Sequence, residues 1–141
     1  MIIQAIETKS VKMVLEQIMA KILIVDDDVE FTTMLERILF KLGFETTAIN
    51  ISSKAVQMAN HILPDLILLD IMMPDINGID LCKMLQSFPN LQHIPIAIVS
   101  ALNDNGSKRD AFNAGAKEFI TKPVFIDEFT KKIKKLISEK Q

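Results

Sequence analysis

Four short apolar runs and one weaker strand-like segment recur along this chain, and segments with helical periodicity separate them. The apolar runs cover residues 21–25, 66–69, 95–99 and 118–121, and the weaker segment covers residues 46–49. A continuous apolar run of this length is typical of a strand that is covered on both faces. Strands that alternate with helices at this spacing predict right-handed βαβ units. The predicted fold class is therefore α/β, with a doubly wound, five-stranded parallel sheet.

The segments between and after these runs place apolar residues three and four positions apart, as a helix requires. The predicted helices cover residues 29–42, 52–62, 79–88, 107–114 and 127–138. Gly43 and Gly115 stand just beyond two of them, where glycine commonly ends a helix. The five pairs fill residues 21–139 without a repeat or linker, so we expect one domain over residues 21–141.

Residues 1–20 stand apart from this pattern as an N-terminal extension. Val11, Val14, Leu15 and Ile18 follow helical spacing within it, which predicts a loosely amphipathic helix. Two interpretations remain open. The extension is either a surface appendage from an upstream start, or a helix that docks on this domain or on a second copy. Docking on a second copy would give a homodimer.

Composition excludes several classes of function. The net charge is −2 and the pI is about 5.7, so nothing attracts nucleic acid to the chain as a whole. No apolar run approaches the roughly 20 residues of a membrane span, and Glu7, Lys9 and Lys12 interrupt any secretory signal. The single Cys82 excludes an internal disulfide and favours a reducing compartment. We therefore expect a cytoplasmic protein.

All four apolar runs end in polar residues that suit phosphoryl chemistry. Asp26 and Asp27 follow the first run, Asp70 the second, Ser100 the third and Lys122 the fourth. Doubly wound sheets bind ligands outside the carboxyl ends of their strands, where the strand order reverses. If the first and third strands are neighbours, three carboxylates converge there and repel one another unless a cation lies between them. Mg²⁺, which prefers oxygen ligands, is the simplest such cation.

Phosphoryl transfer depends mainly on positioning and on neutralising charge. Lys122 can supply a positive charge for the phosphoryl oxygens and Ser100 a hydroxyl. The nucleophile can be a carboxylate, which gives an aspartyl phosphate. The residues thus predict a site that binds Mg²⁺ and a phosphoryl group.

Around these positions, the sequence resembles the receiver domain of bacterial two-component response regulators. The matching segments are residues 22–28, 64–78, 94–101 and 115–123, in the family's order and spacing. The resemblance covers residues 21–139. It implies a receiver like the chemotaxis regulators, either stand-alone or excised from a larger protein, with a flavodoxin-like sheet in the order 2-1-3-4-5.

The resemblance also implies roles for single residues. Asp70 would be the phosphoacceptor. Asp26 and Asp27 would be the acidic pair that holds Mg²⁺, with Asp27 as the more direct ligand. Asp70 and the backbone carbonyl of Met72 would complete the protein ligands. Lys122 would pair with the phosphoryl group.

A switch is implied as well. Ser100 would turn toward the phosphoryl group, and Phe119 would move inward with it; the family more often has tyrosine where this chain has Phe119. The Lys122–Pro123 peptide is expected to be cis, because only X–Pro bonds adopt that form cheaply. The signalling surface would be formed by residues 107–114, 118–121 and 127–138.

The expected partners are a sensor histidine kinase or phosphotransfer protein and a downstream effector protein. The domain would not be an enzyme in its own right, although it could catalyse its own phosphorylation and dephosphorylation. One alternative is a haloacid-dehalogenase-type phosphohydrolase with Asp26 as nucleophile, since residues 26–29 satisfy D-x-D-x-V. That reading leaves Asp70 unexplained. A second alternative is a pseudo-receiver that acts only as an interaction module.

Some neighbouring residues have simpler interpretations. We expect Asp28 to cap the first helix and Gly78 to supply a permissive backbone position in the turn over residues 75–78. Met72 and Met73 are interpreted as packing residues, and Cys82 as a small buried apolar group.

Overall fold

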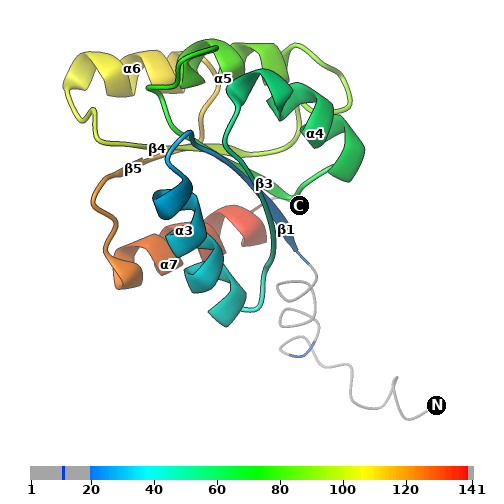
Figure 1. Cartoon of the computed structure of the whole chain (residues 1–141), viewed down its shortest axis with the longest axis vertical. Coiled ribbons are helices and arrows are strands. Elements are labelled where there is room, and N and C mark those ends of the chain that lie inside the picture. Colours follow the sequence, from blue (N-terminus) through cyan, green and yellow to red (C-terminus); the bar gives the residue numbers. More distant parts are fainter. Residues whose placement is uncertain (1–10, 12–19, 140–141) are drawn as a thin grey trace.

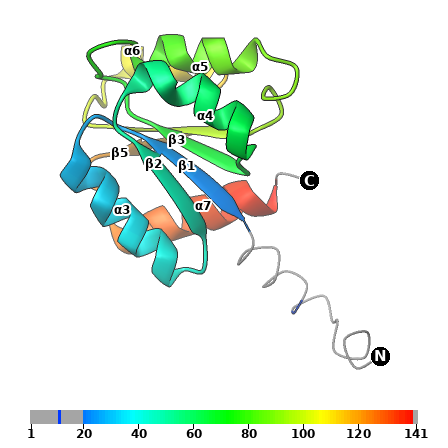
Figure 2. The ribbon, with the colours of Figure 1, turned by 45° about the vertical axis from the view of Figure 1, so that its right-hand side comes forward.

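A central parallel sheet lies between two layers of helices in the computed structural model, which describes residues 11 and 20–139 (Figures 1 and 2). The strands are β1 (Lys21–Val25), β2 (Glu45–Ile49), β3 (Leu66–Leu69), β4 (Ile96–Ser100) and β5 (Glu118–Thr121). All neighbouring strands are parallel, in the order β2-β1-β3-β4-β5. The predicted fold class and strand order are confirmed.

The helices cover both faces of the sheet. They are α3 (Val29–Lys41), α4 (Ala55–Ile62), α5 (Gly78–Gln86), α6 (Asn105–Asn113) and α7 (Ile126–Ser138). Helices α3 and α7 lie on one face and α4, α5 and α6 on the other (Figures 1 and 2). The predicted helix over residues 52–62 is wrong at its start, because a short 3₁₀ turn, η1 (Ser52–Lys54), precedes α4.

Alternation along the strands divides the apolar residues between two cores. Leu23 and Leu69 face the layer of α4, α5 and α6, whereas Ile22 and Leu68 face α3 and α7. Each of these side chains is at most 1% exposed. Burying one stabilises the fold by roughly 1.5–3 kcal/mol relative to leaving it in water. Both faces of the inner strands are covered, so the strands are apolar throughout.

Side chains at the helix ends explain where the helices start and stop. Asp28 caps α3 by accepting a hydrogen bond from the Phe31 N–H at 3.1 Å, as predicted. Asn77 and Asp104 cap α5 and α6 in the same way, each at 3.0 Å. Beyond α3, Gly43 has a φ of 92°, which glycine adopts without strain.

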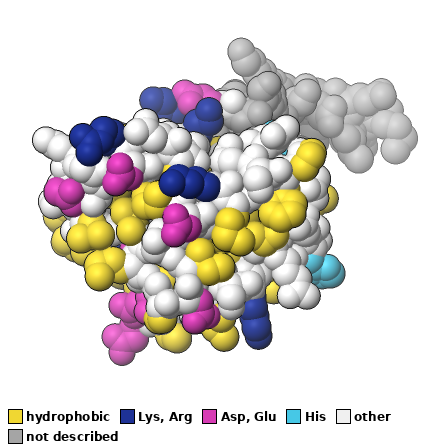
Figure 3. Space-filling model, turned by 90° about the horizontal axis from the view of Figure 1, so that it is seen from above, with side chains coloured by type: hydrophobic (Ala, Val, Ile, Leu, Met, Phe, Trp, Pro, Cys, Tyr) yellow, Lys and Arg dark blue, Asp and Glu magenta, His cyan; other side chains and the backbone are white. Residues whose placement is uncertain are grey.

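The outer surface of the α4–α6 layer is mixed in character. Figure 3 looks onto this layer and shows apolar side chains interspersed with acidic and basic ones. Within the described parts of the chain, no helix combines the length and apolarity needed to cross a membrane. The predicted N-terminal helix falls mostly outside the described residues, which include only Val11 and Ala20 of that segment.

Candidate functional site

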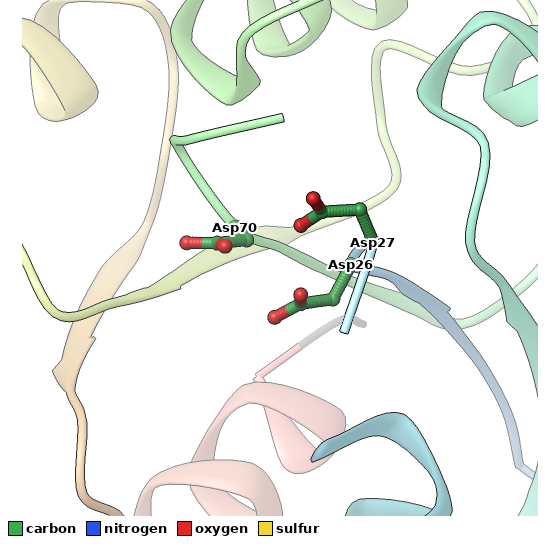
Figure 4. Close-up of side chains that lie close together, drawn as sticks. All are labelled: Asp26, Asp27 and Asp70. Carbon is green, nitrogen blue, oxygen red and sulfur yellow. The ribbon is translucent and has the colours of Figure 1, made fainter. Parts of the chain in front are cut away.

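Strand register brings three carboxylates together at the carboxyl edge of the sheet. Val25 of β1 lies opposite Leu69 of β3, so the residues that follow each strand are also neighbours. The Asp70 N–H donates to the Val25 carbonyl at 3.0 Å, which continues this pairing past the strands. Asp26, Asp27 and Asp70 can each place a carboxylate oxygen within 4.8 Å of the others' (Figure 4). The predicted convergence is confirmed.

Lys122 enters the same cluster from the end of β5. Its Nζ lies 2.7 Å from Oδ2 of Asp26 and 3.4 Å from Oδ2 of Asp70. The Lys122 backbone N–H donates to the Ser100 carbonyl at 2.9 Å, and the Lys122–Pro123 peptide is cis, as predicted. The ammonium therefore bridges two acids that the sequence places 44 residues apart.

Burial controls the electrostatics of Asp26. Loss of water raises the pKa of this carboxyl above its ordinary value, and the nearby charge of Asp70 adds to the rise. Hydrogen bonds from Lys122 and from the Asp28 N–H, at 2.9 Å, act in the opposite direction. Three acids with one lysine leave the cluster short of positive charge, so a divalent cation would stabilise its ionised form.

The donor set fits a hard metal ion. Carboxylate oxygens are the ligands that Mg²⁺ and Ca²⁺ prefer. Asp26 and Asp70 are buried, whereas Asp27 is exposed and gives the cluster an opening to solvent. The acidic cluster can therefore bind a divalent cation that keeps part of its water shell.

The loop after Asp70 is held tightly to it. The Ile71 N–H donates to Oδ1 of Asp70 at 2.8 Å, and the Gly78 N–H donates to the Ile71 carbonyl at 2.8 Å. A Cβ on Gly78 would lie 1.9 Å from the Asp70 carbonyl oxygen. The expectation of a permissive backbone there is wrong, because the glycines with positive φ in the described residues are Gly43 and Gly115 and not Gly78. Gly78 is needed for space.

Met72 and Met73, both expected to be packing residues, differ in burial. Met73 is buried, but the side chain of Met72 is 65% exposed, so the packing interpretation is wrong for Met72. The proposed metal-binding role concerns only its backbone carbonyl and stays a prediction.

Ser100 lies at the end of β4, and Phe119 lies on the neighbouring strand β5. Ser100 is 1% exposed, and its Oγ accepts a hydrogen bond from the Leu102 N–H at 3.2 Å. Phe119 is buried and lies under the Lys108 ammonium, 5.9 Å from the ring centroid. In this structure Phe119 is therefore buried, and the Ser100 hydroxyl is hydrogen-bonded within the β4–α6 loop. Their switching roles stay predictions.

Two further residues touch the site and were missed. The ring centroid of Phe31 lies 4.1 Å from Nζ of Lys122. The Asn50 amide donates to the Asp26 carbonyl at 2.8 Å and to the Thr32 hydroxyl at 3.1 Å. Helical spacing marks Phe31 only as a core residue, and a single asparagine after β2 has no distinguishing pattern.

A cavity of about 700 Å³ opens beside Asp27. It runs along the β3–α5 loop to α5 and α6 and is lined by Asp27, Ile71, Met72, Met73, Pro74, Asn77, Ile79, Asp80, Ser107 and Asp110. The acidic cluster therefore borders this cavity through Asp27.

Fold and site together define an α/β domain with three carboxylates and one lysine at the carboxyl edge of its parallel sheet. The family profile described as "Response regulator receiver domain" matches residues 22–134. The chain belongs to the family of response regulator receiver domains. This membership decides against the haloacid-dehalogenase alternative, and it makes the chain a signalling switch.

Individual relatives agree with this membership. The chain is 37% identical to response regulator PleD of Caulobacter vibrioides over 105 residues, which cover 74% of this chain and 23% of PleD. The signal receiver domain of a histidine kinase from Syntrophus aciditrophicus has a TM-score of 0.79 at 32% identity, covering 85% of this chain and 91% of that one.

A third relative concerns the metal. The receiver domain of sensor histidine kinase PA1611 from Pseudomonas aeruginosa has a TM-score of 0.79 at 25% identity, covering 85% of this chain and 98% of that one. That structure contains a magnesium ion coordinated in its active-site cleft. By contrast with these receiver-domain structures, the chain spans less than half the length of the curated relatives that it matches.

Proposed function

We propose that this domain accepts a phosphoryl group on Asp70, with Mg²⁺ held by Asp26, Asp27, Asp70 and the backbone carbonyl of Met72. One observation carries the proposal. Asp70 lies in a cluster of three carboxylates, and the Lys122 ammonium is 3.4 Å from its Oδ2. The nucleophile, a cation site and a positive charge for the phosphoryl oxygens thus lie together.

The reaction is an in-line displacement at phosphorus. A carboxylate oxygen of Asp70 forms the new P–O bond while the bond from phosphorus to the donor breaks. The electron pair of that bond leaves with imidazole when the donor is a phosphohistidine, or with acetate when it is acetyl phosphate. Because only positioning and charge neutralisation are required, the domain can catalyse its own phosphorylation, and with water as nucleophile its own dephosphorylation.

Mg²⁺ would neutralise the charge that develops on the phosphoryl oxygens. Lys122 would bind another of those oxygens after giving up part of its interaction with Asp26. The Ile71 N–H, 2.8 Å from Oδ1 of Asp70, orients the carboxylate so that Oδ2 is available for attack. The fixed loop keeps this geometry ready before a donor arrives.

The new charge would then operate a switch. A phosphoryl group adds about −1.5 to −2 charge and three acceptor oxygens. Ser100 would exchange its bond to the Leu102 N–H, at 3.2 Å, for one to the phosphoryl group. The β4–α6 loop and Phe119 would follow, and the surface formed by α6, β5 and α7 would carry the signal.

We further propose that the phosphoryl donor is a sensor histidine kinase or a phosphotransfer protein, and that an effector protein reads the α6–β5–α7 surface. A second proposal is that residues 1–20 mediate a homodimer. Residues 21–141 would form the receiver, and the cytoplasm would be its location, consistent with the free thiol of buried Cys82.

Acetyl phosphate and intact mass spectrometry test the proposal. Wild-type protein with Mg²⁺ should gain one phosphoryl group, and Asp70→Asn should gain none. Asp26→Asn should gain little, because the metal site is weakened while the nucleophile remains. A mass gain that survives Asp70→Asn would disprove the assignment of the phosphoacceptor.

A further inference from the structure

The Lys122 ammonium has an aromatic partner as well as two acidic ones. Its Nζ lies 4.1 Å from the ring centroid of Phe31, inside the range in which a cation is attracted to the face of an aromatic ring. Phe31 is partly buried against the core that α3 and α7 cover, and the Lys122 side chain is 18% exposed. Limited solvent access strengthens an attraction of this kind.

The backbone of Phe31 is fixed by the same loop that carries the acids. The Phe31 N–H donates to Oδ1 of Asp28 at 3.1 Å, which anchors the first turn of α3. The Asp28 N–H in turn donates to Oδ1 of Asp26 at 2.9 Å. The backbone of Phe31 and the carboxylate of Asp26 are therefore tied to the same loop.

Metal binding would change what Lys122 can bind. Its shortest ionic contact is the 2.7 Å bond to Asp26, and Asp26 is also one of the acids available to a cation. A divalent ion competes for that negative charge. The Phe31 ring is a neutral partner, so it can hold the ammonium without withdrawing charge from the metal site.

We propose that Phe31 is a positioning residue for Lys122. Its ring face holds the ammonium at the side of the pocket between Asp26 and Asp70, where it can meet the phosphoryl oxygens. This inference rests on the proposed function, since the benefit lies in phosphorylation of Asp70. It differs from a packing role because it depends on the electrons of the ring and not only on its volume.

Fluorination separates these two roles. Replacing Phe31 with mono-, di- and trifluorinated phenylalanine weakens the negative face of the ring in steps and nearly preserves its shape. Phosphorylation from acetyl phosphate at saturating Mg²⁺ should slow stepwise, by about two- to fivefold over the series. Phe31→Leu should be at least as slow. The same substitutions at Phe40, which lies on α3 and is 78% exposed, should have no effect.

NMR spectroscopy gives a second reading that needs no phosphorylation. The ε-methylene protons of Lys122 should resonate upfield in the resting protein because they are next to the Nζ atom that lies over the ring, and Phe31→Leu should abolish that shift. Unshifted Lys122 protons in the wild type would overturn the proposal. So would a wild-type rate throughout the fluorinated series.

These failures can be told apart from failure of the proposed function. A mass gain that survives Asp70→Asn removes the reaction that Phe31 is proposed to serve. If labelling does depend on Asp70 and the fluorinated proteins still react at the wild-type rate, only the role of Phe31 is overturned. Equal thermal unfolding across the series serves as the check that folding is unchanged.

Discussion

At the scale of single residues, the site depends on an imbalance of charge. Lys122 lies 2.7 Å from Asp26 and 3.4 Å from Asp70, while Asp27 lies toward solvent. One ammonium among three carboxylates cannot neutralise them all. Burial raises the pKa of the Asp26 carboxyl, and the nearby charge of Asp70 adds to the rise.

We expect Asp26→Asn to remove a pH-dependent loss of stability. A carboxyl group whose pKa is raised on folding contributes stability that is fully present below its ordinary pKa of 3.8 and is lost as pH rises through the raised value. In metal-free protein, the variant should therefore gain free energy of unfolding relative to wild type as pH rises from about 4 toward neutrality.

Urea unfolding at several pH values measures this difference. Asp127→Asn, at an exposed position in the first turn of α7, serves as the control and should follow the wild-type profile. A difference between Asp26→Asn and wild type that stays constant across the pH range would contradict the prediction.

Single residues also show how far sequence reasoning reaches. Asp26, Asp27, Asp70 and Lys122 were predictable because each follows an apolar run, and parallel strands present their carboxyl ends at one edge. The role of Phe31 was not predictable in this way. Its contact with Lys122 depends on how α3 is rotated, and helical spacing alone assigns Phe31 to the core.

At the scale of elements, the ends of helices and strands were predictable where the sequence carries a local signal. Strands β3 and β5 match the predicted runs, because both faces are covered and polar residues bound each run. Helix α6 begins two residues earlier than predicted, at Asn105, because Asp104 supplies its cap. The space required at Gly78 could not be predicted, since it arises from the approach of α5 to the Asp70 backbone.

Gly78→Ala should damage the site through that approach. The added Cβ would meet the Asp70 carbonyl oxygen at 1.9 Å, so either the β3–α5 loop or α5 must move. We expect a loss of at least about 2 kcal/mol in the free energy of unfolding, together with slower phosphorylation. Thermal unfolding and acetyl phosphate labelling provide the two measurements.

Gly106→Ala in α6 is the matched control. There the nearest atoms to an added Cβ belong to exposed side chains, Oδ2 of the cap residue Asp104 at 3.2 Å and a guanidinium nitrogen of Arg109 at 3.8 Å, and not to the backbone. Alanine also favours a helix more than glycine does. The control should keep or raise stability, and equal effects of the two substitutions would show that crowding at Asp70 is not the cause.

At the scale of the whole molecule, the site and the cores share the same strands. The residues before Asp26 and Asp70 are buried in the sheet, and one of the cores continues to Cys82 on α5, whose Sγ lies 3.4 Å from the Ala114 carbonyl. Burial raises the pKa of this thiol from 9.0 to about 11. The rate at which Cys82 reacts with a thiol reagent therefore measures how often the fold opens.

Alkylation of Cys82 should be slow in the folded protein. At about pH 8, the shift of about two units leaves roughly a hundredfold less thiolate than in the unfolded chain, and burial blocks the reagent as well. Because the pKa is raised on folding, the thiol also contributes stability that is present below 9.0 and is lost as pH rises through about 11.

Mg²⁺ at a hundred times its dissociation constant should slow this alkylation further, by about a hundredfold where the reaction requires global opening. Iodoacetamide labelling followed by mass spectrometry measures both effects. Asp27→Ala should keep the slow reaction and lose its response to Mg²⁺. If folded wild-type protein were alkylated as fast as protein unfolded in urea, the prediction that burial protects Cys82 would be wrong.

The parallel arrangement of the five strands also bears on how the domain can be altered. Every residue assigned to the site lies at the carboxyl edge or on the strands and loops that lead to it. The loops that enter the strands, such as the one between α5 and β4, lie at the opposite edge. Engineers could therefore insert reporter or output modules there while the chemistry at the other edge is left unaltered.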